Sequence, residues 1–329
     1  MVNQALIAKK AGVSISMVSR VLSGWADSGG VAKAKAEKIR RIAAQLGYRP
    51  NLAGRMLRTN KSKTVGLLFS SQSHLYRELV PDLQKRLFAN GYSAVCGFWN
   101  TVDDADAVIG ALSSGWVDGV IAGHPPAEMK RLGVQAPTIH FMYDARDRDC
   151  VIVDKADALR KVIGYLTSLG HKRILFLGSG MQEDGDMLGE YRAAGLVAGA
   201  YDWKSRFFLP AIRSELVETL RTALSRSDGD RPTAVVCGDD AMAVLCVTIL
   251  QNMGKRVPGD LSVVGAENLD IGQIAMPAIT TCGPHREKIA DALVDTLLAR
   301  LNEPESPPRR IILPSEIIVR ESTGPRKAP

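Results

Sequence analysis

The positive charges of this chain are concentrated at its N-terminal end. Residues 1–63 contain thirteen lysines and arginines and two acidic residues, whereas the whole chain of 329 residues contains 42 and 35. The front segment therefore has a net charge of +11, and the remaining residues have a net charge of −4. Cations gathered on one surface neutralise phosphates, and this term supplies most of the non-specific affinity for DNA. The charge distribution therefore favours DNA binding by the front segment.

A second group of candidate residues follows the short apolar runs of the remaining chain. If those runs are strands of parallel sheets, a ligand binds beyond their carboxyl ends. The residues at these positions are rich in hydrogen-bonding groups. They are Ser70, Trp99, His124, Tyr143, Ser179, Asp239 and Glu267.

The basic segment has the pattern of a helix–turn–helix. Asn3 can cap a first helix that ends near Ala11, and Gly12 suits the turn because glycine tolerates a positive φ. Ser14 can cap a second helix that ends near Leu22. A helix in this position can lie in the major groove of DNA and contact base edges and phosphates. Its outward positions are Ile15, Ser16, Ser19 and Arg20.

A third helix and a short connecting segment are expected next. The third helix runs from Ala32 to Leu46, and Gly47 ends it. Asn51 can then cap a helix of six residues that ends near Leu57. Such a short helix is marginal because nucleation is costly, so we expect it to form only when docked. The alternative is a plain interdomain linker.

Apolar runs alternate with helix-period stretches from Thr64 onward. This alternation, with short connections, predicts parallel sheets covered on both faces. One sheet is possible, but two are favoured, with Leu169–Lys172 as the crossover. The expected strands are Val65–Phe69, Ala94–Phe98, Gly119–Ala122, Thr138–Met142, Val151–Val153, Arg173–Leu177, Ala234–Cys237, Ser262–Gly265, Ile311–Leu313 and one within Ile317–Arg320. The expected helices are Glu78–Asn90, Ala105–Ser114, Ala156–Leu169, Glu190–Ala198, Ile212–Ser225, Ala241–Met253 and Arg286–Asn302.

Composition limits the class of protein. Hydrophobic residues make up 46% of the chain, which is enough for two or three packed domains. No run of eighteen uncharged apolar residues occurs, so we predict no membrane span, and no apolar signal core opens the chain. The five cysteines are scattered, with no CxxC or Cys/His cluster. We therefore expect a reduced, cytoplasmic protein without a metal or cofactor.

Three segments of the front region form an ordered set of motifs. They are Ala11-Gly12-Val13-Ser14, Val18-Ser19-Arg20-Val21-Leu22 and Leu46-Gly47-Tyr48-Arg49-Pro50-Asn51. Together they resemble the headpiece of the LacI family of bacterial transcription regulators. The resemblance implies that Ile15, Ser16 and Arg20 read bases and that Ser19 makes a phosphate-side contact, with Ser14 in the same DNA-binding set. The loop between Leu22 and Val31 is about three residues longer than the family usually shows.

The same resemblance assigns a role to the short segment after the headpiece. It implies docking as a dimer pair in the minor groove of DNA, through Asn51, Ala53, Arg55 and Leu57. Leu57 matches the family's leucine wedge, which unstacks a base step at a cost of a few kcal/mol. Gly54 stands where alanine is usual and costs about 1 kcal/mol of helix propensity. We therefore expect this hinge to depend more on DNA than its relatives do.

The resemblance continues through the rest of the chain. The motifs that carry it are Gly170-His171-Lys172-Arg173-Ile174, Gly238-Asp239-Asp240, Val257–Gly265, Ile279-Thr280-Thr281, Leu313-Pro314 and Val319-Arg320-Glu321-Ser322. They imply a periplasmic-binding-protein-like core of two Rossmann-like parallel-sheet subdomains joined by three crossovers. The expected domain limits are residues 1–49 for the helix–turn–helix headpiece, 50–62 for the hinge, 63–169 with 284–313 for core subdomain 1, and 170–283 with 314–329 for core subdomain 2.

An effector site between the subdomains is also implied. Arg192 matches the family's effector-binding arginine, and Asp239 and Glu267 match polar contacts of the second subdomain. Asp154 matches an acidic position of the first subdomain. The segment that usually supplies aromatic and apolar walls is His74-Leu75-Tyr76. The expected effector set is Ser70, His74, Tyr76, His124, Asp154, Arg192, Asp239 and Glu267.

Several of these residues also have a plain structural interpretation. Asp154 could only cap the helix that follows it, and Arg192 could pair with a surface carboxylate. Asp240 is expected to cap its helix, so Asp239 is preferred as the ligand contact. His124 is balanced between a structural and a binding role.

Two short segments bear on the nature of the effector. Asp270-Ile271-Gly272-Gln273 and Pro284-His285-Arg286-Glu287 are similar to the gluconate-utilisation repressor of the family. This similarity favours a sugar acid, whose carboxylate would need a cation such as Arg192. A neutral sugar remains the alternative.

These features predict an allosteric DNA-binding transcription regulator, a repressor, controlled by a sugar or sugar acid. The expected partners are double-stranded operator DNA, the effector and a second copy of the chain. A homodimer is expected because the family's tetramerising leucine-heptad tail is absent. The alternative is a cytoplasmic sugar-binding protein without regulatory DNA binding. An enzyme is not expected, because GxGxxG after the first strand, the P-loop, GxSxG and HExxH are all missing.

Overall fold

The computed structural model describes residues 3–22, 31–48, 61–71, 73–99, 102–112, 116–131, 133–178, 197–202, 209–227 and 229–326. The chain divides into two compact units, Met1–Ser62 and Lys63–Pro329.

The first unit contains the expected helix–turn–helix. Its helices are α1 (Gln4–Ala11), α2 (Ile15–Leu22) and α3 (Lys33–Gln45). The Asn3 side chain accepts a hydrogen bond from the Leu6 N–H at 3.0 Å, and Gly12 has a φ of 70°. The Ser14 hydroxyl accepts a hydrogen bond from the Met17 N–H at 3.2 Å. Both caps and the glycine turn therefore follow the sequence pattern.

A small core joins these three helices. Ile7 of α1, Val18 of α2 and Ile39 of α3 are each fully buried. Gly47, with a φ of 62°, ends α3, and the Tyr48 N–H donates back to the helix. The apolar spacing of each helix is thus used to bury one face against the other two.

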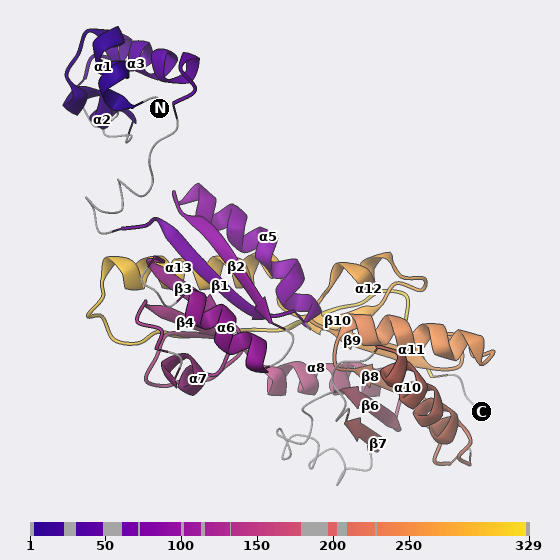
Figure 1. The fold of residues 1–329 in the computed structure, drawn as a ribbon. Coiled ribbons are helices and arrows are strands. Elements are labelled where there is room, and N and C mark those ends of the chain that lie inside the picture. Colours follow the sequence, from indigo (N-terminus) through magenta and orange to yellow (C-terminus); the bar gives the residue numbers. More distant parts are fainter. Residues whose placement is uncertain are drawn as a thin grey trace. The chain divides into compact units, whose positions relative to one another are not determined.

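Two six-stranded sheets form the second unit (Figure 1). Their strand orders are β11-β5-β4-β3-β1-β2 and β12-β10-β9-β8-β6-β7. Strand β12 pairs antiparallel with β10, and the other described strand pairs are parallel. The first sheet contains β1 (Thr64–Ser70), β2 (Ser93–Trp99), β3 (Gly119–Ala122), β4 (Thr138–Phe141), β5 (Cys150–Val153) and β11 (Arg310–Leu313). The second contains β6 (Ile174–Gly178), β7 (Val197–Asp202), β8 (Ala234–Cys237), β9 (Ser262–Ala266), β10 (Thr280–Gly283) and β12 (Glu316–Ile318).

Helices cover both faces of each sheet. On the first sheet, α5 and α13 pack on one face, and α6 and α7 pack on the other. On the second sheet, α10 and α11 pack on one face and α8 packs on the other. The bounds are α5 (His74–Ala89), α6 (Val102–Leu112), α7 (Pro126–Arg131), α8 (Lys155–Ser168), α10 (Leu209–Leu224), α11 (Asp240–Asn252), α12 (Asp270–Ile274) and α13 (Arg286–Asn302).

The first crossover is not where the sequence analysis placed it. We expected it at Leu169–Lys172, with residues 63–169 in the first subdomain. Instead, α8 packs on the second sheet through Val162, Ile163 and Leu166, so the chain crosses before α8 begins. Helical periodicity identifies the buried face of α8, but it carries no information about which sheet that face covers.

Part of the expected secondary structure is also corrected. The helix expected at Glu190–Ala198 is wrong at its C-terminal end, because Val197 begins strand β7. Residues 179–196 lie outside the described part of the chain. Strand β10 and the short helices α7 and α12 were not expected, since each is too short to show a clear period.

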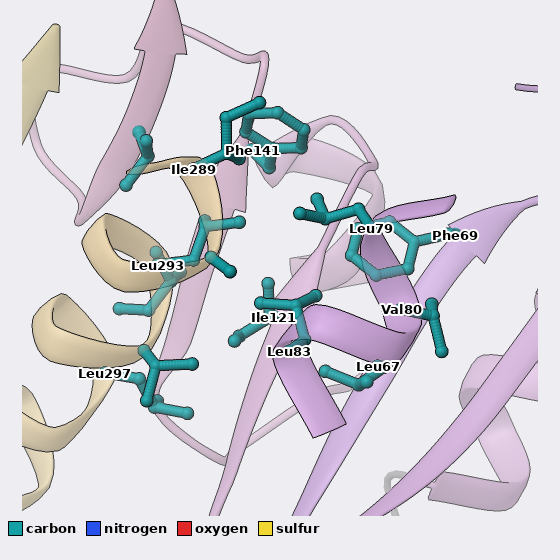
Figure 2. Packing of buried hydrophobic residues seen from close by; sticks show 14 of the residues in the cluster. Leu67, Phe69, Leu79, Val80, Leu83, Ile121, Phe141, Ile289, Leu293 and Leu297 are labelled. Atoms are coloured by element: carbon teal, nitrogen blue, oxygen red, sulfur yellow. The ribbon is translucent and has the colours of Figure 1, made fainter. Parts of the chain in front are cut away.

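The largest hydrophobic cluster lies between the first sheet and helices α5 and α13 (Figure 2). Leu67 and Phe69 of β1 face Leu79 and Leu83 of α5, and all four side chains are fully buried. The cluster also contains Leu269, which follows β9 of the second sheet and is fully buried. A residue of the second half of the core therefore completes the packing of the first.

We predict that Leu83→Ala destabilises the protein by about 2–5 kcal/mol, because it removes a buried side chain and leaves a cavity. The measurement is the free energy of unfolding from urea denaturation of the whole chain. Lys85→Ala, on the exposed side of the same helix, is the matched control and should change stability by no more than about 0.5 kcal/mol. Equal losses in the two variants would contradict the packing described.

Candidate functional site

Helix α2 presents the residues expected to contact DNA. Val18 and Val21 are buried against the other helices, whereas Ser16 and Arg20 are exposed and Ile15 is 52% exposed. An exposed isoleucine beside a serine and an arginine lets one helix face make both apolar contacts and hydrogen bonds. This face is free of acidic residues, as befits a surface that approaches phosphates and base edges.

Two serines order the beginning of this face. The Ser14 hydroxyl, which caps α2, lies 2.9 Å from the Ser16 hydroxyl. Ser19 is half-buried one turn further along the helix. Lys9 and Lys10 lie in the last turn of α1, where they complement the helix dipole and add positive charge to the unit. The predicted hinge contacts Asn51, Ala53, Arg55 and Leu57 lie outside the described residues, as does the long loop at 23–30.

In the second unit, the candidate ligand residues of the first sheet follow its strands as expected. Ser70 and Trp99 are the last residues of β1 and β2, and His124 and Tyr143 lie two residues beyond β3 and β4. The rings of Trp99 and His124 are 5.0 Å apart between centroids. Met142, just before Tyr143, has a φ of 67°, which is uncommon for a non-glycine residue. Such strained positions cluster at binding sites, which supports this edge of the sheet as part of the candidate site.

Tyr76 packs against two other aromatic side chains of the first sheet. Its ring centroid is 4.8 Å from that of Phe69 and 5.8 Å from that of Phe141. The ring also covers Gly123, where an added Cβ would lie only 2.6 Å from the Tyr76 Cζ atom. Burial, together with Tyr143 and Glu267, raises the pKa of Tyr76, so its hydroxyl keeps its proton. His74 begins the same helix and is half-buried.

The second sheet contributes acidic residues at its carboxyl edge. Asp239 follows β8, and its carboxylate accepts a hydrogen bond from the Met242 N–H at 2.7 Å. Asp239 is therefore the N-cap of α11, and the expectation that Asp240 has this role is wrong. Asp240 is fully buried and accepts from the Leu269 N–H instead. Asp154 likewise caps α8 by accepting from the Asp157 N–H at 2.9 Å.

Glu267 sits on a tight turn after β9. Glu267 and Asn268 have φ values of 80° and 53°, so both occupy the left-handed region. A Cβ added at Gly283 would lie 3.1 Å from the Glu267 Cα atom, so the strand beside the turn needs a glycine there. Burial raises the pKa of Glu267 well above its usual value, and the nearby Asp239 and Asp240 add to the effect. A protonated Glu267 can donate a hydrogen bond as well as accept one.

The structure brings residues of the two halves together at this turn. Glu267 lies close enough to Tyr76 to influence its pKa, and Lys155 and Glu78 act on Glu267 from α8 and α5. Lys155 was not among the expected site residues, although its place directly after the Asp154 cap is a usable signal. Arg192 and Ser179 lie outside the described residues.

The two segments that suggested a sugar acid meet in an ion-pair cluster. The Arg286 guanidinium contacts the carboxylates of Glu78 and Asp82 on α5 and of Asp270 on α12. The Asp270 N–H also donates to Glu78 at 3.1 Å. Arg286 and Asp270 therefore bind each other across the two halves. Packing between the halves explains the similarity of these two segments to another repressor as readily as a ligand carboxylate does.

The described residues contain no cluster of three or more histidine, cysteine, aspartate or glutamate side chains placed to hold a metal ion. None of the helices in the same ranges has the length and apolarity to cross a membrane.

We predict that Gly123→Ala destabilises the protein by about 1–3 kcal/mol, because the new methyl group overlaps the buried Tyr76 ring. Urea denaturation of single and double variants measures the effect. In a Tyr76→Ala background, where the ring is gone, the same glycine substitution should cost much less. Additive effects in this double-mutant cycle would show that the two residues do not share space.

Both units are similar to known protein families. Residues 7–51 match the family model described as bacterial regulatory proteins, lacI family, and residues 163–323 match the periplasmic binding protein-like domain. The HTH-type transcriptional regulator PtxS of Pseudomonas aeruginosa is 28% identical, with 97% of this chain and 95% of that protein covered. The transcriptional repressor PurR of Escherichia coli is 26% identical, with 97% and 96% covered.

Solved structures share the fold of the whole chain. The lac repressor dimer bound to operator and the anti-inducer ONPF superposes with a TM-score of 0.75 at 23% identity, covering 98% of this chain and 99% of that one. The transcriptional regulator CelR in complex with cellobiose gives a TM-score of 0.66 at 24% identity, covering 98% and 100%. The helix–turn–helix unit, the two parallel-sheet halves and the matched family models agree, and the chain belongs to the LacI family of bacterial regulatory proteins.

Proposed function

We propose that this protein is a transcriptional repressor that binds operator DNA as a homodimer and responds to a sugar or sugar acid. One observation carries the DNA-binding part of the proposal. Helix α2 buries Val18 and Val21 and exposes Ile15, Ser16 and Arg20. It lies within residues 1–63, whose net charge is +11 against −4 for the rest of the chain. A recognition helix in the major groove needs this division between a packed face and a reading face.

The chemistry of the second unit supports a hydroxyl-rich effector. Trp99 and Tyr76 offer flat apolar surface, and the carboxyl groups of Asp239 and Glu267 offer hydrogen bonds to hydroxyls. The related CelR structure holds cellobiose, a sugar, which is consistent with this class of ligand. A sugar acid would need a cation, and Lys155 and Arg192 are the candidates.

The proposed regulation couples the two sites through the hinge. Closure of the two halves of the core around an effector would change the spacing of the paired hinge segments, and with it the affinity for DNA. Coupling between two such sites usually amounts to about 1–3 kcal/mol, which is a change of roughly five- to 150-fold in affinity. The paired segments themselves are residues 51–57 of each protomer.

Two other functions are disfavoured. The PtxS and PurR relatives are transcription regulators, so an enzymatic role has no support from similarity. A sugar-binding protein without regulatory DNA binding would not need the exposed face of α2. If the purified protein binds sugars but ignores all genomic DNA fragments at low salt, this second function is the correct one.

We predict that Arg20→Ala lowers the ratio of affinities for operator and random DNA by roughly five- to 150-fold, because one base contact is worth about 1–3 kcal/mol. Fluorescence anisotropy with a selected genomic fragment and a scrambled duplex measures the ratio of affinities. Arg41→Ala, which removes an exposed cation from α3 of the same unit, is the control. It should weaken binding to both duplexes equally, and an equal pattern for Arg20→Ala would place the recognition surface elsewhere.

We also predict that Arg192→Ala leaves the affinity for operator DNA unchanged but removes the response to the effector. The physical reason is that Arg192 is proposed to contact the ligand and not the DNA. The measurement is operator binding with and without D-gluconate and D-glucose, for the wild type and the variant. Arg213→Ala removes an exposed arginine from α10 and should respond as the wild type does. A fully responsive Arg192→Ala protein would show that the arginine lies outside the pocket.

A further inference from the structure

Three successive backbone N–H groups of the turn that contains Glu267 donate hydrogen bonds to neighbouring residues. The Glu267 N–H donates to the Cys282 carbonyl at 3.1 Å, and the Asn268 N–H donates to the Thr281 hydroxyl at 3.3 Å. The Leu269 N–H donates to a carboxyl oxygen of Asp240 at 2.7 Å. The last of these bonds is the shortest, and it ties the turn to the beginning of α11.

The Asp240 side chain is enclosed by the turn and by the strand and helix on either side of it. This side chain is fully buried, and its Oδ1 atom has no hydrogen-bond partner among the described residues. A Cβ added at Gly265 would overlap that Oδ1 atom, and one added at Gly272 would lie 3.1 Å from the Asp240 Cγ atom. Two glycines, one on each side of the turn, therefore make room for this carboxyl group.

We propose that Asp240 is a positioning residue for the effector site, which holds the Glu267 turn against α11 through the Leu269 amide and does so as an uncharged acid. The proposal rests on the proposed role of Glu267 as a ligand contact. Asp240 acts through Glu267, because it fixes the backbone two residues further along the turn.

The surroundings of Asp240 disfavour its charged form. The charged and titratable groups that face it are Asp239 on the adjoining cap, Glu267 on the turn, Cys237 of β8 and Arg320 from the segment after β12. Arg320 donates to the Ile279 carbonyl, just before β10, and to the side chain of Asn268 on the turn. A buried carboxylate with one oxygen unpaired is costly, and neutralisation is the usual response.

The direction of the pKa change agrees with this geometry. Burial raises the pKa of Asp240 to about 7, although hydrogen bonds from Thr281 and Leu269 and the charge of Arg320 act in the opposite direction. An acid whose pKa is raised on folding stabilises the folded state at low pH, and that contribution is lost as the pH rises through the folded pKa. The turn should therefore be held best at low pH, loosen progressively as the pH rises to about 7, and be held least above that.

Hydrogen exchange on the full-length protein tests this directly and needs no ligand. The readout is the protection of a peptide that covers residues 265–275, corrected for intrinsic exchange, at about pH 6 and about pH 8. In the wild type we expect protection to fall by roughly tenfold between the two. Asp240→Asn should keep high protection at both, because the amide accepts from Leu269 and cannot ionise. Asp240→Ala should be poorly protected at both, and Glu218→Gln, at an exposed position of α10, should match the wild type.

Two results would overturn the proposal. If Asp240→Ala protects the peptide as well as the wild type does, Asp240 does not hold the turn. If Asp240→Asn shows the same pH dependence as the wild type, the titrating group is another one, such as Glu267. The Asp240→Asn comparison decides even if the alanine variant does not fold.

A second arm separates this proposal from the proposed function. Isothermal titration with D-gluconate and D-glucose at the same two pH values compares the wild type with Asp240→Asn. We expect the wild type to bind one of these ligands more weakly at the higher pH and the asparagine variant to show a smaller change. If neither ligand is bound by the wild type while the exchange results are as expected, the sugar effector is wrong and the positioning of the turn stands. If Asp240→Asn loses affinity at the higher pH as much as the wild type does, positioning by the uncharged acid fails.

Discussion

The burial of Leu269 in the core of the first sheet is the contact on which the candidate effector site depends. Leu269 follows a strand of the second sheet, yet its side chain completes the cluster formed by β1, α5 and α13. It lies two residues after Glu267 and one residue before Asp270, which pairs with Arg286. Because one residue is anchored in the opposite half, the carboxyl group of Glu267 is brought within reach of Tyr76. Packing between the two halves therefore positions this candidate ligand contact.

Much of the fold could be predicted from local patterns. Asn3, Gly12 and Ser14 act as expected because caps and turns are decided by a few neighbouring residues. Strands β3 and β8 have the expected bounds, since buried parallel strands are short apolar runs with clear ends. The residues just past the strands therefore fall at the carboxyl edges, as the pattern indicated.

The failures arise where one local pattern fits two arrangements. Asp239 and Asp240 are both suitable caps, and the choice between them depends on where the backbone leaves β8, which the sequence does not show. The bounds of α8 were predicted to within one residue at each end. The sheet on which α8 packs was predicted wrongly, because periodicity shows which face of a helix is buried but not what buries it. The approach of Tyr76 to Gly123, 47 positions along the chain, has no local signal at all.

The Arg286 cluster has a further consequence for how the halves respond to the medium. The Arg286 guanidinium is shared by two carboxylates of helix α5 in the first half and one of helix α12 in the second. Asp270 is the most exposed of the three, at 61% against 24% for Glu78 and 28% for Asp82. Dissolved ions screen exposed charges far more than enclosed ones. Rising ionic strength therefore weakens the bond across the halves first and leaves the bonds within the first half largely intact. Salt concentration should thus bias the relative motion of the halves, separately from its effect on the attraction between the headpiece and DNA.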